Sequence, residues 1–127
     1  MNVIDSSAWL EFFAGGPNAD FFAPALRAVE DLIVPSVTIY EVFKRVLQQR
    51  GESAALQAVA VMQQGSVVDL SAAAALDAAR VSVETGLPMA DAIILSQARA
   101  AGATLWTQDA DLQGMDGVEY AAARPRS

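Results

Sequence analysis

A chain of 127 residues that is 54% hydrophobic has the size and apolar content of one domain with a sizeable core, so we expect a single domain over residues 1–127. The chain contains no histidine and no cysteine, which excludes a Ser-His-Asp triad, a thiol nucleophile, a disulfide framework and a zinc site of the usual kind. The net charge of −7 weighs against a nucleic-acid partner unless bound cations neutralise several of the acidic residues.

Short apolar runs alternate with longer amphipathic runs along the chain, and Gly or Pro separates most of them. The expected elements, in chain order, are a strand over 2–5, helices over 6–13 and 19–30, a strand over 31–34, helices over 36–50 and 53–64, a strand over 67–69, helices over 72–85 and 88–101, a strand over 103–107 and a short fifth strand over 118–121. Because helical segments separate the strands, we expect an α/β fold with a central parallel sheet of four to five short strands and helices on both faces.

Several boundary residues carry a local prediction. Pro24 lies inside the second helical run and is expected to kink or break it, while Pro88 is expected to open a later helix. Ser71 is a good N-cap for the alanine-rich helix, and Asp69 is assigned to capping the same helix. The basic tail over 121–127 is expected to be mobile.

The location expected from the sequence is the cytoplasm. The first residues have no basic region before their apolar run, which is unlike a secretory signal. No run reaches the roughly 18 apolar residues that a membrane span requires, so no membrane association is expected.

Four acidic residues are expected to converge on one edge of the sheet. Asp5 closes the first strand, Asp109 follows the strand over 103–107, and Glu41 and Asp91 lie in helices that follow a strand or a turn. In open parallel sheets the ligand site lies beyond the carboxyl ends of the strands. Two carboxylates about 4 Å apart repel by about 4 kcal/mol at an effective dielectric near 20, so such a cluster needs protons or a divalent cation. Carboxylate oxygens suit Mg²⁺, Mn²⁺ or Ca²⁺, and Mg²⁺, with Mn²⁺ as a substitute, is the ion expected for phosphoryl chemistry.

Four segments in order resemble the PIN-domain family, and within it the VapC-type toxins of bacterial toxin–antitoxin pairs: VIDSSAWLEFF, SVTIYEVFKRVLQQRG, GLPMADAIILSQARAAGATLWTQD and the continuation DADL. The resemblance implies a ribonuclease that uses Mg²⁺ or Mn²⁺, with Asp5, Glu41, Asp91 and Asp109 as catalytic metal ligands and Ser6 and Thr107 as neighbouring hydroxyls. It also implies an RNA substrate, a cognate antitoxin partner and a homodimer. Two positions depart from the family pattern, with Val42 in place of leucine and Leu112 in place of an aromatic residue.

Each acidic residue also has a purely structural interpretation. Asp5 or Ser6 can be the N-cap of the first helix, and Glu41 can form an exposed helix pair with Arg45. Asp91 is favourable near a helix N-terminus in any case, but it interrupts an apolar stretch where a carboxylate needs a partner. Asp111 is either a helper ligand or a solvated side chain.

Two further features bear on partners. The large aromatic residues near the first turn are expected to be mostly core, with the remainder exposed as a partner surface: Trp9, Phe12, Phe13, Phe21 and Phe22. The resemblance implies that this region receives an antitoxin segment. The side chains available to face phosphates are Arg27, Lys44, Arg45, Arg80 and Arg99.

The acidic pattern together with the family resemblance implies three functions, in order of preference. The first is a metal-dependent endoribonuclease toxin that hydrolyses RNA with Mg²⁺-activated water. The alternative is a catalytically silent PIN-like module that binds a metal or a partner. A phosphohydrolase of small esters is disfavoured because the first strand ends in DSS and not in a D-x-D nucleophile motif.

Overall fold

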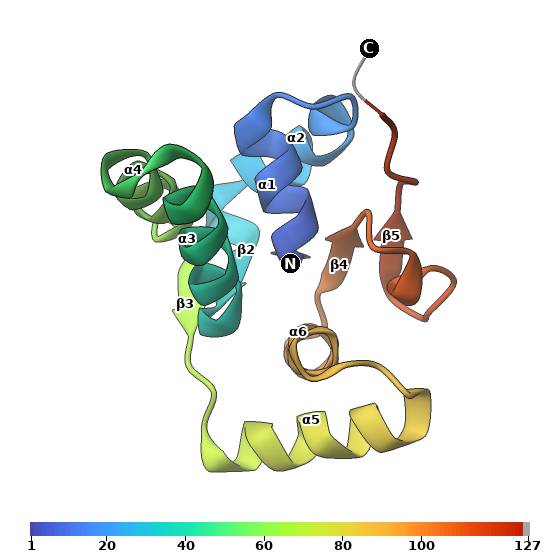
Figure 1. Ribbon diagram of the computed structural model, residues 1–127. Coiled ribbons are helices and arrows are strands. Elements are labelled where there is room, and N and C mark those ends of the chain that lie inside the picture. The colour runs from blue at the N-terminus through green and yellow to red at the C-terminus, as the bar shows by residue number, and fades with distance from the viewer. Residues whose placement is uncertain (126–127) are drawn as a thin grey trace.

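The computed structural model describes residues 1–125 and shows a five-stranded parallel sheet covered by helices on both faces (Figure 1). The strand order is β3-β2-β1-β4-β5, with every neighbouring pair parallel. The elements in chain order are β1 (Asn2–Ile4), α1 (Ser6–Ala14), α2 (Ala19–Arg27), η1 (Val29–Asp31), β2 (Leu32–Pro35), α3 (Ser36–Arg50), α4 (Glu52–Met62), β3 (Ser66–Val68), α5 (Ala72–Thr85), α6 (Met89–Ala100), β4 (Thr104–Thr107), η2 (Ala110–Leu112) and β5 (Val118–Tyr120). The predicted α/β class and parallel sheet are confirmed.

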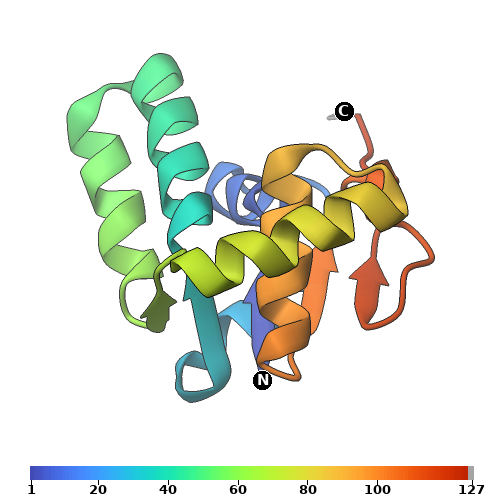
Figure 2. The same ribbon diagram turned by 90° about the horizontal axis from the view of Figure 1, so that it is seen from below.

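The sheet separates two hydrophobic cores because successive strand residues point to opposite faces. Ile4 and Val34 belong to a core that α1, α2, α3 and α4 cover, together with the buried Trp9 and Phe22. Val3 and Ile33, which precede Ile4 and Val34 in the sequence, point to the opposite face. They belong to a second core beneath α6, together with Leu105 of β4. Figure 2 shows α5 lying across the outer side of α6, while α3 and α4 form an antiparallel pair at the other side of the molecule. Burial on both faces explains why β1 and β2 read as continuous apolar runs, whereas the edge strand β3 is exposed.

Several boundaries differ from the sequence prediction. Pro24 lies within α2 and does not break it, since the helix runs from Ala19 to Arg27. Pro88 is the N-cap residue of α6 and not its first helical residue. Ser71 caps α5 by accepting a hydrogen bond from the Ala74 N–H, whereas the Asp69 carbonyl accepts from the Gln97 side chain, so the capping role assigned to Asp69 was wrong.

The segment after β5 contacts the loop before α2. The Ala122 carbonyl accepts a hydrogen bond from Asn18, and Arg124 donates to the Asn18 side chain and to the Pro17 carbonyl. The mobile tail expected over 121–127 stays a prediction, and its last two positions lie outside the described residues. Within the described residues, no helix has both the length and the apolar character that crossing a membrane requires.

Candidate metal centre

Asp5 lies where β1 passes into α1, at the carboxyl edge of the sheet. Its backbone has the extended conformation of an N-cap residue, but its side chain makes no capping hydrogen bond to α1. Instead, one carboxylate oxygen of Asp5 accepts hydrogen bonds from the Ser7 hydroxyl at 2.7 Å and from the Thr107 hydroxyl at 2.8 Å. Asp5 is only 3% exposed. The N-cap interpretation therefore does not account for this buried carboxylate.

Glu41 faces the first turn of α1 from the neighbouring helix α3. The Ser6 hydroxyl donates to its carboxylate at 2.6 Å. The alternative exposed pair with Arg45 does not form, because the one ion pair among the described residues joins Arg80 to Asp77. Ser6 therefore lies beside an acid as predicted, and that acid is Glu41, which fixes α3 against α1.

Asp91, Asp109 and Asp111 form the tightest acidic group. One carboxylate oxygen from each lies within 4.8 Å of the other two. Two oxygens on opposite sides of one Mg²⁺ are about 4 Å apart, so small side-chain adjustments would allow all three to reach one ion. Asp91 comes from the first turn of α6, Asp109 follows β4, and the Asp109 side chain accepts a hydrogen bond from the Asp111 N–H at 2.9 Å. Asp111, left open by the sequence, thus lies close enough to act as a helper ligand.

The electrostatics link this trio to Asp5 and Glu41. Burial raises the pKa of Asp91 to about 7, and the charges of Asp109, Asp5 and Glu41 act in the same direction. Burial also raises the pKa of Asp5 against the opposing effect of its hydroxyl donors, and it raises the pKa of Glu41. The charges of these acids therefore interact with one another across the site. A bound cation would lower the cost of holding all of them ionised.

Ser7 and Thr107 join the parts of the site. Thr107 is fully buried, donates to Asp5 and accepts from the Asp109 N–H at 2.9 Å, so one hydroxyl contacts the acids that follow two neighbouring strands. Thr107 was expected beside the acids from the sequence, whereas Ser7 was not, and Ser7 contacts Asp5 in place of Ser6. The adjacent serines gave a signal for a hydroxyl at this turn. Which serine faces Asp5 depends on how α1 leaves the sheet.

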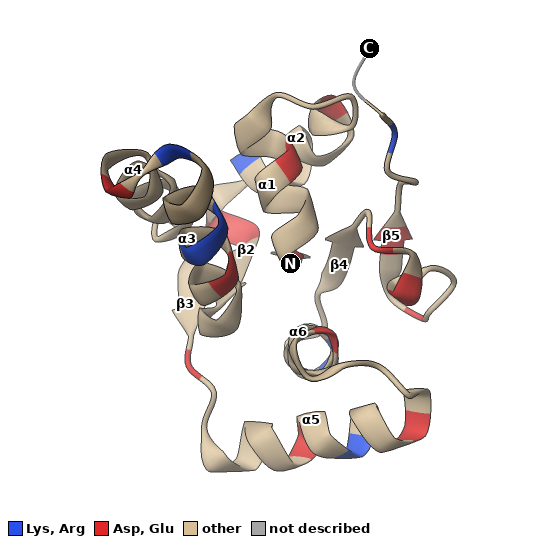
Figure 3. Ribbon diagram, viewed as in Figure 1, with Lys and Arg blue, Asp and Glu red and all other residues tan. Residues whose placement is uncertain are grey.

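The oxygen ligands of the site come from four separate parts of the fold. Its acids come from the end of β1, from α3, from α6 and from the loop after β4, and Figure 3 shows the acidic segments on α3, on α6 and after β4. Neither histidine nor cysteine exists in the chain to compete as a ligand. Such a set favours a hard divalent cation.

Comparison with known proteins gives a family match and close structural likenesses. The sequence model of the PIN domain matches residues 3–118. A toxin–antitoxin complex from Klebsiella pneumoniae is 22% identical with a TM-score of 0.78, covering 94% of this chain and 96% of that chain. A protein from Pyrobaculum aerophilum is 25% identical with a TM-score of 0.75, covering 94% of this chain and 87% of that chain. Mycobacterium tuberculosis VapC20, described as a sarcin–ricin loop cleaving toxin, is 20% identical with a TM-score of 0.67, covering 82% and 85%. No curated protein sequence matches the chain.

Proposed function

Since the chain belongs to the PIN-domain family, we propose that it is a metal-dependent endoribonuclease and the toxin of a toxin–antitoxin pair. The observation that carries the proposal is the gathering of Asp91, Asp109 and Asp111 within reach of one ion, beside a buried Asp5 and a half-buried Glu41. A purely structural role does not account for placing so many carboxylates together. The names of the Klebsiella pneumoniae and Mycobacterium tuberculosis relatives support the toxin and RNA-cleaving parts of the proposal.

The residues present fit a divalent cation. Asp91, Asp109 and Asp111 would hold it, and Asp5 and Glu41 would complete its surroundings directly or through water. When bound, Mg²⁺ or Mn²⁺ would lower the pKa of a water molecule and offset charge on the scissile phosphate. The chain supplies the arrangement: Thr107 and Ser7 hold the Asp5 carboxylate in one orientation, and Ser6 holds Glu41. Hydrolysis adds water across a P–O bond and leaves a phosphate and a hydroxyl at the two new ends.

The proposal includes an antitoxin that binds next to the site. A cavity of about 210 Å³ lies between α1, α3 and α4, where the apolar side chains of Phe13, Val46, Ala58 and Val61 line it beside the polar Arg50 and Gln57. Side chains of an amphipathic antitoxin segment would fit it. Of the aromatic residues expected to form the docking patch, Trp9 and Phe22 are buried, and Phe21 is the one that is substantially exposed, at 40%. The cytoplasm, where RNA and antitoxin meet, is the proposed location.

A homodimer is the proposed assembly. Leu76, Val83 and Met89 are 60%, 87% and 75% exposed, and they lie on α5 and at the start of α6. Val83 and Met89 line an apolar cavity of about 550 Å³ between these helices, to which Leu70 and Ile93 also contribute. Large apolar side chains gathered on one face mark a protein–protein contact.

The deciding experiment is cleavage of total RNA by the purified chain with Mg²⁺, with Mn²⁺ and with EDTA. We expect discrete fragments that require metal and disappear in the Asp91→Asn variant. The matched control is Asp77→Asn, which changes an exposed acid outside the site and is expected to cleave normally. Absence of cleavage under every metal condition would contradict the ribonuclease assignment and favour a silent module that binds a metal or a partner.

A further inference from the structure

We propose that the cavity between α1 and α3, directly beside the acidic site, binds the RNA nucleotide next to the scissile phosphate, with Arg45 holding a backbone phosphate and the Gln108 side chain donating to the nucleotide. This proposal rests on the ribonuclease function proposed above. It adds the location and the residues of one substrate-binding subsite.

The cavity has the size and position for this role. Its volume is about 370 Å³, which is within the range of pockets that hold small ligands. Its lining includes Ser7, whose hydroxyl donates to the Asp5 carboxylate, so the cavity and the acidic site share a wall one side chain thick. A strand of RNA with its scissile phosphate at the acids would therefore place an adjacent nucleotide here.

The charge of the cavity favours a phosphate. Two of the eight basic residues of the chain, Arg45 and Arg50, contribute to the lining. Neither makes an ion pair within residues 1–125, where the Arg80–Asp77 pair stands alone. The other candidates for phosphate contact have partners elsewhere. Arg27 lies over the Phe12 ring and Lys44 over the Tyr40 ring. Arg80 pairs with Asp77, and the Arg99 side chain donates to the Asp116 carbonyl.

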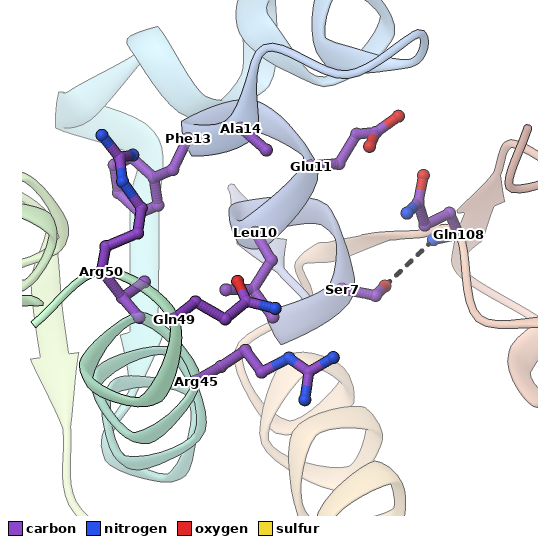
Figure 4. A pocket seen from close by; sticks show the side chains of 10 residues that line it. Ser7, Leu10, Glu11, Phe13, Ala14, Arg45, Gln49, Arg50 and Gln108 are labelled. Carbon is purple, nitrogen blue, oxygen red and sulfur yellow. Dashed lines mark hydrogen bonds between the residues drawn. The ribbon is translucent and has the colours of Figure 1, made fainter. Parts of the chain in front are cut away.

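The acid in the lining does not cancel these charges. The Glu11 carboxylate accepts a hydrogen bond from the Asn18 N–H at 2.8 Å and lies against Gly16. Figure 4 shows that Glu11 points away from Arg45 and Arg50, while the Arg45 and Gln49 side chains extend from α3 toward α1. The Arg45 side of the cavity thus presents hydrogen-bond donors to an anion.

Gln108 supplies an oriented donor on the opposite wall. Its side-chain oxygen accepts from the Asn18 amide at 3.1 Å, and its backbone N–H donates to Ser7. Because the oxygen is occupied, the side-chain nitrogen is the group turned toward the cavity, as Figure 4 shows. Asn18 is itself buried and is fixed by Ala122 and Arg124. A donor held in this way can select among nucleotide groups that accept a hydrogen bond.

The test uses binding and cleavage of a mixed-sequence single-stranded RNA, with Ca²⁺ replacing Mg²⁺ in the binding assay and anisotropy of a fluorescent label as the readout. Arg45→Gln is expected to weaken binding about tenfold at low salt, because a hydrogen bond to a charged group is lost. It is also expected to reduce the salt dependence of log K by about 0.7, the contribution of one phosphate contact on a single strand. Arg45→Lys should restore the salt dependence.

Gln108→Glu keeps the oxygen that Asn18 requires but removes the donor and adds a negative charge, so it is expected to raise the KM for cleavage. The matched control Arg80→Gln, on the outer helix α5, is expected to change neither binding nor cleavage.

The outcomes separate the two proposals. A native chain that neither binds nor cleaves RNA would overturn the ribonuclease function and the subsite with it. A native chain that cleaves, together with Arg45→Gln and Gln108→Glu variants that bind and cleave equally well, would overturn the subsite alone. If Arg45→Gln cleaves normally but escapes inhibition by the antitoxin, the cavity belongs to the antitoxin and the proposal is wrong.

Discussion

Asp91→Asn is expected to make the metal-free protein more stable at alkaline pH. Burial and the neighbouring carboxylates raise the pKa of Asp91 from its ordinary value of 3.8 to about 7. For a fully buried group, this rise in pKa would correspond to a free-energy cost of ionisation in the folded state of about 4 kcal/mol, at about 1.4 kcal/mol for each tenfold change in proton affinity. Because Asp91 is only half-buried, solvent screening reduces the expected gain to about 1–2 kcal/mol.

The sign of the pH dependence follows from the raised pKa. Between about pH 4 and pH 7 the folded protein holds a proton on Asp91 that the unfolded chain releases. The cost of ionising Asp91 is therefore absent below about pH 4 and complete above pH 7, so the free energy of unfolding falls as the pH rises through this window. The raised pKa values of Asp5 and Glu41 act in the same direction.

Thermal unfolding in EDTA at pH 5 and at pH 8 measures this difference. At pH 8 we expect the Asp91→Asn variant to unfold about 3–8 °C above the native chain. The difference in melting temperature between the variant and the native chain should narrow at pH 5. It should also narrow at pH 8 when Mg²⁺ is added, because the ion stabilises only a site with ionised ligands. Asp77→Asn serves as the control and should change little. Equal melting temperatures of the native and Asp91→Asn chains at pH 8 in EDTA would refute this reasoning.

Three other predictions concern the hydroxyl network, the core and the assembly. Thr107→Val should destabilise the chain by about 1–3 kcal/mol in urea titrations and sharply reduce RNA cleavage, since Asp5 and the Asp109 N–H both lose a buried partner. The control Thr107→Ser keeps the hydroxyl and should retain both the stability and the cleavage activity. Trp9→Ala should cost about 3–5 kcal/mol in urea unfolding because Trp9 is fully buried, while an unchanged midpoint would exclude its core role. Val83→Asp should convert a dimer to a monomer in sedimentation without affecting the fold, and a persistent dimer would exclude the α5–α6 face.

The amino-acid sequence was sufficient for the fold class and for most of the elements. Helical periodicity and Gly or Pro boundaries located the six helices to within a few residues, and apolar runs located the five strands. The same local patterns gave Asp69 a capping role that belongs to Ser71, left open whether Pro24 would kink or break its helix, and placed Pro88 one position too far into α6, because tertiary packing and small changes in cap geometry decide how a helix end is used.

The acids of the site were also visible in the sequence, because Asp5 and Asp109 follow apolar strands. Their proximity was only an expectation from the parallel topology. It depends on β4 pairing with β1 across about a hundred residues of chain, where Asn2 is in register with Thr104 and Ile4 with Trp106. No local pattern contains that pairing.

The tertiary structure alone decided which neighbours each side chain meets. The angle at which α1 leaves the sheet turns Ser7 toward Asp5 and Ser6 toward Glu41, although the two serines are adjacent in sequence. The position of α3 against α1 directs Glu41 to Ser6 and leaves Arg45 on the wall of a cavity. Periodicity and composition are local properties of the sequence. The contacts described here depend instead on the relative placement of elements far apart in the chain, and packing of the two cores against the sheet sets that placement.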